Sequence, residues 1–223
     1  MLDNGTLIRA RLKTPRAAAI AGIAFSVLTI TIFWLLRRSI PADPLELGAW
    51  LATDSKAVAL ALNLVPFAGV AFLWFVGVLR DRLGQQEDRF FATVFFGSSL
   101  LFLAMLFAVA AFGGAVILVA SSAQPNELIN SVTFRFARAA AYIFMNVYAI
   151  KMAGVFMIST STIVIYTAVA PRWIALLGYA LACILLAGSY YISWSFAVLP
   201  IWVFLISIYV LIDNWRQPME RSR

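Results

Sequence analysis

Long runs of apolar residues constrain this chain more than any other feature of its sequence. An α-helix rises about 1.5 Å per residue, so roughly 20 apolar residues cross the roughly 30 Å hydrocarbon core of a bilayer. Six such runs are present, at residues 17–36, 57–79, 91–120, 150–170, 173–190 and 196–212. The third run is longer than one crossing requires, so we expect it to tilt or to project beyond the bilayer. The sequence therefore predicts an all-α fold, a polytopic transmembrane bundle of six helices.

The composition agrees with residence in a membrane. Of the 223 residues, 63% are hydrophobic and 12% are charged, whereas a soluble domain has about 25% charged residues. The formal net charge of +7 would suggest nucleic acid as the partner of a soluble chain. In a membrane protein it is explained by basic segments beside anionic headgroups. We therefore expect membrane lipids, and no nucleic acid, as partners.

The distribution of basic residues predicts the orientation of the bundle. With the N-terminus inside, 11 of the 17 Lys and Arg residues fall in cytoplasmic segments and 6 in outer ones. This excess predicts that both termini are cytoplasmic. The chain then divides into a basic N-terminus (1–16), a six-helix transmembrane domain (17–212) and a cytoplasmic tail (213–223). The six outer residues are Arg37, Arg38, Lys56, Arg135, Arg138 and Lys151.

Two connections on the outer side are longer than turns. Residues 39–55 carry an apolar edge, which predicts a short interfacial helix with Trp50 at headgroup depth and Asp54 or Ser55 capping the second span. Residues 124–149 either lie on the outer surface as an interfacial helix or extend the fourth span as one long helix. The sequence leaves both alternatives open.

Polar side chains are concentrated in the fourth span. At 100° per residue, five of them fall within an arc of about 80°: Tyr148, Lys151, Ser159, Thr162 and Tyr166. An unpartnered polar group is costly in hydrocarbon, so this stripe is expected to face neighbouring helices or a wet cavity. The residues either form hydrogen bonds between helices or line a ligand cavity. Lys151 either extends to the interface at the edge of the span or attracts an anionic group.

Several catalytic chemistries lack their residues. The chain has no histidine, and its ten carboxylates lie in loops or at span ends, so an imidazole base, a histidine-bound metal and an intramembrane aspartate pair are excluded. An unusual serine–lysine arrangement at Lys151 is the remaining catalytic route. Cys183, the only cysteine, is expected to be buried as a small apolar residue. We therefore expect no enzyme, no cofactor and no metal site.

A short motif follows the second span. Residues 77–84, from Gly77 through Asp81 to Gly84, match G-x-x-x-D-x-x-G, which resembles the loop between helices two and three of major facilitator transporters. The resemblance covers eight residues, and the basic pair expected next is Gln85 and Gln86 here. A helix that ends in Arg and Gly explains the same residues without a transporter.

A broader pattern covers most of the chain. It comprises F-L-W-F-x-G-V-L-R-D-R-L-G at 72–84, the lysine-bearing span with its S-T-S-T sequence, and P-R-W-x-A-x-x-G-Y at 171–179. This pattern resembles a family of six-helix bacterial integral membrane proteins of unknown function. The resemblance implies a six-helix fold and location in the bacterial inner membrane, and it implies no activity.

Together these features predict a non-enzymatic interaction or accessory component that associates with a membrane-protein partner or with itself. Small residues that favour helix association form two faces: Ala17, Ala18, Ala21 and Gly22, and Ala104, Ala108, Ala111 and Ala115. The alternative is a small-molecule or lipid transporter or binding protein in which the polar stripe lines a cavity. A third interpretation is lipid binding in an outward groove roofed by residues 124–145, against Phe134, Phe136 and Tyr142.

Overall fold

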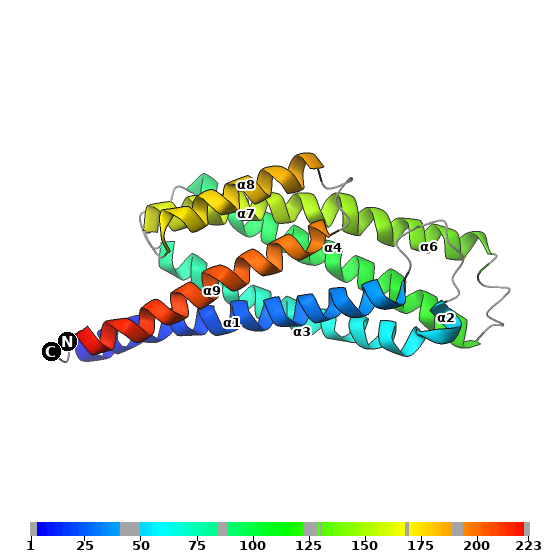
Figure 1. Ribbon diagram of the computed structural model, residues 1–223, viewed down its shortest axis with the longest axis horizontal. Helices are drawn as coiled ribbons and strands as arrows, with labels where there is room; N and C mark the ends of the chain where they lie inside the picture. The colour runs from blue at the N-terminus through cyan, green and yellow to red at the C-terminus, as the bar shows by residue number, and fades with distance from the viewer. Residues whose placement is uncertain are drawn as a thin grey trace.

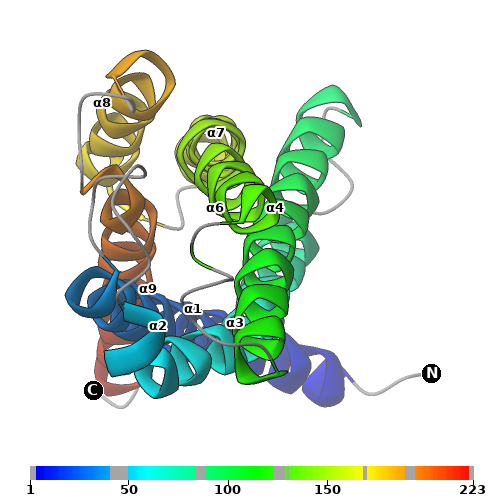
Figure 2. The ribbon, with the colours of Figure 1, turned by 90° about the vertical axis from the view of Figure 1, so that its right-hand side faces the viewer.

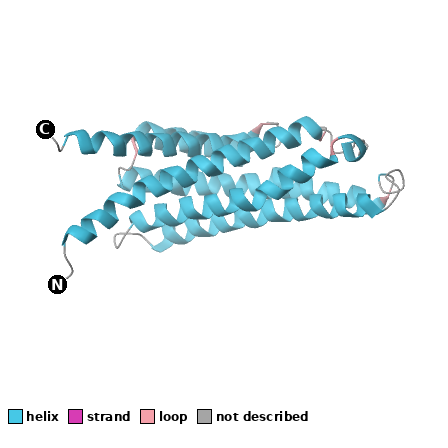
Figure 3. Cartoon of the chain, turned by 90° about the horizontal axis from the view of Figure 1, so that it is seen from below, coloured by secondary structure: helices cyan, strands magenta, loops and turns pink. Residues whose placement is uncertain are grey.

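The computed structural model describes residues 4–40, 50–83, 89–122, 129, 131–167, 170–188 and 194–220, and throughout these ranges the regular structure is helical. The elements are α1 (Asn4–Ser39), α2 (Trp50–Thr53), α3 (Ser55–Leu83), α4 (Arg89–Ser122), α6 (Val132–Ile143), η2 (Phe144–Ala149), α7 (Ile150–Thr167), α8 (Arg172–Gly188) and α9 (Ser195–Glu220). The long helices run alternately up and down one axis (Figures 1 and 3). Helix α1 starts and α9 finishes at the same end, which we call the terminal end; α2 lies at the opposite, distal end (Figure 1).

Five of the described helical segments are long and apolar enough to cross a membrane. They are Arg16–Ser39, Ser55–Arg80, Phe91–Ser121, Val132–Tyr166 and Ser195–Asp213. The sixth, α8, is apolar but has only 17 residues, which correspond to about 25 Å. The predicted all-α bundle is therefore confirmed, with one short helix among its six.

The fourth span begins much earlier than the predicted residue 150. Ser131 caps α6 by accepting a hydrogen bond from the Phe134 N–H at 3.1 Å. The six-residue π-helix η2 then connects α6 to α7, so the segment Val132–Tyr166 is one 35-residue helical span. Of the two alternatives for residues 124–149, the part from Val132 onward extends the fourth span. Helix α6 lies beside α4, and both project past α8 and α9 at the distal end (Figure 1).

Within the interfacial helix predicted for residues 39–55, the described residues include the four-residue helix α2, while residues 41–49 lie outside the described ranges. Trp50 is 7% exposed and packs in a cluster with Val58, Val116 and Phe134. Trp50 is therefore covered by α6, and its depth at the headgroups stays a prediction. Backbone hydrogen bonds from Asp54 to Trp50 and from Val58 to Asp54 join α2 to α3.

Phenylalanine rings hold four helices together at the centre of the bundle. The ring of Phe72 on α3 has its centroid 4.7 Å from Phe25 of α1, 5.4 Å from Phe102 of α4 and 5.0 Å from Phe156 of α7. All four side chains are buried. Viewed from the distal end, α7 lies between α4 and α8 (Figure 2).

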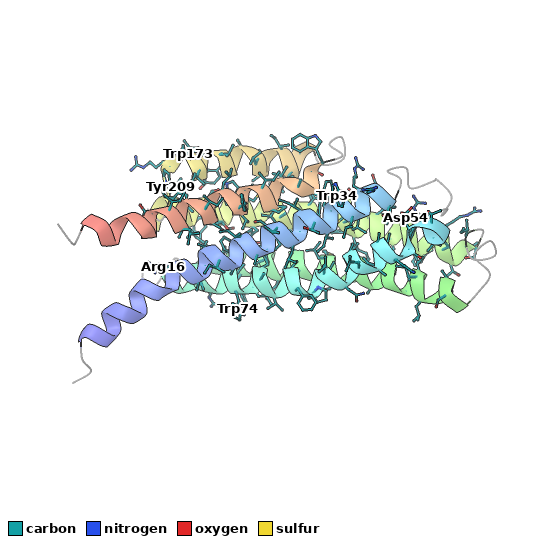
Figure 4. All side chains as sticks on the ribbon, turned by 60° about the horizontal axis from the view of Figure 1, so that its bottom comes forward. Arg16, Trp34, Asp54, Trp74, Trp173 and Tyr209 are labelled. Carbon is teal, nitrogen blue, oxygen red and sulfur yellow. The ribbon has the colours of Figure 1, made fainter. Side chains whose placement is uncertain are left out.

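Aromatic and charged side chains mark the two ends of the bundle. Arg16, Trp173 and Tyr209 lie toward the terminal end, and Trp34 and Asp54 lie toward the distal end (Figure 4). Such residues gather at membrane–water interfaces because their polar groups remain hydrated. Their positions agree with a bundle whose long axis crosses the bilayer.

Candidate functional site

Helix α7 is enclosed by its neighbours over most of its length. It packs mainly against α8 and α4, and Ser159, Thr160 and Ser161 are each at most 3% exposed. An unpartnered polar group is costly in such a position, yet the hydroxyls of Thr160 and Ser161 have no hydrogen-bond partner among the described residues.

Lys151 reaches the end of α8. Its Nζ atom donates hydrogen bonds to the backbone carbonyl oxygens of Leu185, at 3.4 Å, and of Leu186. Both carbonyls belong to the last turn of α8, which ends at Gly188. Carbonyls in the last turn accept no hydrogen bond from N–H groups of their own helix. A cation at a helix C-terminus is also favoured by the helix dipole. Lys151 thus caps α8 from the side of α7.

Thr162 makes a second link between the same two helices. Its Oγ1 lies 2.7 Å from the hydroxyl oxygen of Tyr179 on α8 and 3.0 Å from the carbonyl of Ile158 in its own helix. Ser159 bonds within α7, donating to the carbonyl of Val155 at 3.0 Å. The structure therefore gives these two hydroxyls partners within the protein.

The two tyrosines of the stripe point elsewhere. Tyr148 is 53% exposed and Tyr166 is 81% exposed, so the five predicted residues do not form one buried stripe. Tyr148 belongs to η2, where π-helical turns depart from the 100° per residue that the prediction assumed. Tyr166 lies in the last turn of α7, where a tyrosine suits the interface.

Two contacts of the α7–α8–α9 region carry no obvious signal in the sequence. Gly178 of α8 has no side chain, and a Cβ there would collide with the Ser161 hydroxyl and lie 2.5 Å from the Trp202 ring of α9. The Trp202 indole donates to the carbonyl of Ile174 at 3.2 Å. Small residues of this kind allow helices to approach closely. Gly178 belongs to the motif at residues 171–179, and this membership is the sequence feature that singles it out.

A second candidate site lies at the distal end. It is a cavity of about 110 Å³ between α1, α2, α3, α4 and α6, and we call it the distal cavity. Its lining is almost entirely apolar, with Arg138 as the charged residue among the described lining residues. Its lining includes Leu36, Trp50, Leu62, Val116, Phe134 and Arg138.

The distal cavity corresponds in part to the groove predicted under residues 124–145. Phe134 is buried and lines it. Phe136 is 68% exposed and Tyr142 is half-buried, and neither is among the described lining residues. The sequence thus indicated the segment but only one of the three aromatic contacts.

Two further predictions concern single features. Cys183 is exposed rather than buried, because the face of α8 that packs inward carries Gly178, Ala182 and Leu185 instead. The G-x-x-x-D-x-x-G motif continues α3 as far as Leu83, while residues 84–88 lie outside the described ranges. Within the described residues, no three His, Cys, Asp or Glu side chains gather in a way that would hold a metal ion.

No family model matches the chain, and comparisons with curated proteins and with solved structures found no match. The resemblance to six-helix bacterial membrane proteins therefore stays a prediction from the sequence. Three features of the structure bear on function: an α7–α8 contact held by a lysine, an apolar distal cavity, and the exposed faces of the helices.

Proposed function

We propose that this protein is a non-enzymatic component of the bacterial inner membrane, with both termini in the cytoplasm, that associates through α4 with a helix of a partner or of a second copy. The observation that carries the proposal is the stripe of small residues on the exposed side of α4. The proposal concerns association, and no chemical step is assigned to the protein.

Helix α4 has little of its apolar surface covered. In its most apolar 18-residue stretch, 22% of residues are buried, compared with 50% in the similarly apolar α9. The exposed side of α4 carries small residues that fall within an arc of about 60° at 100° per residue. They are Gly97, Ala104, Ala108, Ala111 and Ala115, of which Ala104, Ala111 and Ala115 are exposed.

The same chain uses a similar face inside the bundle. Ala18 and Ala21 of α1 are buried, and a Cβ on Gly22 would collide with Ser207 of α9 and lie 2.9 Å from Phe75 of α3. Small residues therefore bring α1 into close contact with two neighbours. In a bilayer, close approach of this kind is a main source of helix association, because lipid and side chains are equally apolar. The stripe of small residues on α4 is suited to close packing against a helix of a partner protein or of a second copy.

Photo-crosslinking in native membranes tests this proposal. A benzophenone amino acid replaces Leu101, which is 50% exposed and flanks the stripe, and in a control it replaces Leu176 of α8, which is 62% exposed. We expect an adduct from position 101 and none from position 176. An adduct of twice the chain mass identifies a second copy, and another mass identifies a different protein. Ala104→Leu with Ala111→Leu should abolish the adduct, whereas Ala180→Leu on the exposed side of α8 should not. Equal crosslinking at both positions, or none at either, would overturn the proposal.

The alternative function, a transporter with the stripe of α7 lining a cavity, makes a different prediction. It requires Lys151 and Thr162 to face a ligand, whereas their observed partners are groups of α8. This supports a structural role for both side chains. Lys151→Met should then leave uptake or binding of any anionic solute unchanged at matched protein stability. Loss of binding without loss of stability would favour the transporter.

A further inference from the structure

We propose that the distal cavity binds one acyl chain of an anionic phospholipid, with the Trp50 indole N–H donating to an ester carbonyl and the phosphate lying beside Arg138. This site is separate from the α4 stripe, so failure of the crosslinking experiment above would leave it standing.

The distal cavity lies at the depth where the acyl chains of the bilayer meet the lipid headgroups. Leu36 lies 20 residues beyond Arg16 in α1, which is about 30 Å along the helix and equals the thickness of the hydrocarbon core. Val58 also lines the cavity and is in the first turn of α3, at the distal start of the second span. The cavity is therefore at the distal boundary of the bilayer, within reach of a lipid of that leaflet.

The lining and size suit an alkyl chain. Apart from Arg138, the described lining side chains are apolar or aromatic. The volume of about 110 Å³ is similar to engineered apolar cavities of about 150 Å³, which stay dry and accept benzene. An apolar cavity of this size favours a short length of hydrocarbon over water.

Trp50 supplies an unused hydrogen-bond donor at the same place. Its side chain lines the cavity, is 7% exposed, and its Nε1 atom is buried without an acceptor in the described part of the chain. A buried donor without an acceptor is unfavourable, and buried tryptophans usually find a partner. The ester carbonyl of a lipid combines an acceptor with an attached alkyl chain, which satisfies both features of the cavity.

The charges around the cavity favour an anion. Arg138 lines it, and none of the described lining residues is acidic. Arg37 and Arg38, both exposed, lie between the lining residues Leu36 and Ile40 of α1. Arg37 and Arg38 are among the six basic residues on the predicted outer side, where an excess of basic residues is not expected. A binding site for an anionic headgroup would explain their presence there. Arginine binds phosphate strongly because its planar group donates two parallel hydrogen bonds.

The test uses the purified full-length protein, stripped of lipid and returned to phosphatidylglycerol, phosphatidylcholine, or the ether-linked form of phosphatidylglycerol, all with the same chains. Retained lipid is counted by native mass spectrometry. We expect phosphatidylglycerol to be retained about tenfold over phosphatidylcholine, because both lipids carry a phosphate but the choline cation of phosphatidylcholine is repelled by Arg138. We expect the ester form to be retained about threefold over the ether form, since the ether lacks the carbonyl.

Three variants assign the contacts. Arg138→Gln should remove the preference for phosphatidylglycerol, whereas Arg135→Gln, on the exposed side of α6, should keep it. Trp50→Phe should remove the preference for the ester form. Ala137→Leu, which fills the cavity from α6, should lower retention of all three lipids.

Three results would overturn the proposal. The first two concern the unmodified protein: equal retention of the three lipids, or retention of none of them. The third is an unchanged headgroup preference in Arg138→Gln, a substitution that removes the charge without adding bulk to the cavity and so remains informative if Ala137→Leu fails to fold.

Discussion

The side-chain oxygens of Thr162 and Tyr179 lie 2.7 Å apart and join α7 to α8. Tyr179→Phe removes only the hydroxyl of this pair, and Thr162 keeps its bond to the carbonyl of Ile158. The coupling between Tyr179→Phe and Thr162→Val should therefore be about 0.6 kcal/mol, the usual size for a hydrogen bond between membrane helices. A double-mutant cycle on the free energy of unfolding in detergent measures it. Strictly additive effects of the two substitutions would show that the pair contributes nothing.

Replacing Lys151 should loosen the distal end of α8. Lys151→Met keeps a long side chain but removes the donor to Leu185 and Leu186, and a hydrogen bond from a charged group contributes about 1.5–3 kcal/mol. We expect a loss of that size in the free energy of unfolding, with faster amide hydrogen exchange in the last turn of α8. Lys56→Met, at an exposed position of α3, is the matched control and should change neither. An unchanged exchange rate in Lys151→Met would mean that the cap is dispensable.

Substitution by alanine, which adds one methyl group, should affect stability differently at two glycines with different surroundings. A Cβ at Gly178 would press on Ser161 and on the fully buried Trp202 ring, whereas a Cβ at Gly77 of α3 would meet nothing within 4 Å. Gly178→Ala should lower the free energy of unfolding by about 1–3 kcal/mol, the cost of overpacking a core. Gly77→Ala should be neutral or stabilising by up to about 1 kcal/mol, because alanine favours the helix. Thermal unfolding of both variants checks the prediction, and equal effects would contradict it.

The ring of Phe72 should be among the most sensitive in the bundle. It is fully buried and packs against rings from three other helices. Phe72→Ala leaves a cavity where α1, α3, α4 and α7 meet and should lower the free energy of unfolding by about 3–5 kcal/mol. Phe67 on the same helix is 66% exposed, so Phe67→Ala is the matched control and should have a small effect. Unfolding in a graded denaturing detergent measures both.

Much of the fold follows from local sequence. Apolar runs of sufficient length can satisfy their backbone only as helices in hydrocarbon, so five of the six predicted spans agree with the structure to within a few residues. The fourth differed at its start. Its polar and charged residues, such as Arg135 and Arg138, lowered the apolar signal, while the cap at Ser131 and the packing of α6 on α4 kept the chain helical.

The candidate sites depended more on packing. Periodicity placed Lys151 and Thr162 on one side of α7, and both do meet α8. It also placed Tyr148 and Tyr166 there, and both are exposed. A π-helical segment changes the angle between successive side chains, and its position is not encoded in any short pattern of residues. Exposure likewise depends on which neighbour covers a face, as Cys183 illustrates.

The sequence by itself determined the helical class of this protein, the approximate limits of most of its spans and the absence of histidine chemistry. These properties depend on side-chain type and on distance along the chain. The tertiary structure decided which partner each polar group found: the last carbonyls of α8 for Lys151, and none among the described residues for the buried indole of Trp50. It also decided where α1, α2, α3, α4 and α6 leave a cavity. Contacts between residues far apart in the chain arise from how helices pack in three dimensions. The periodicity of a single helix does not specify which neighbours it packs against.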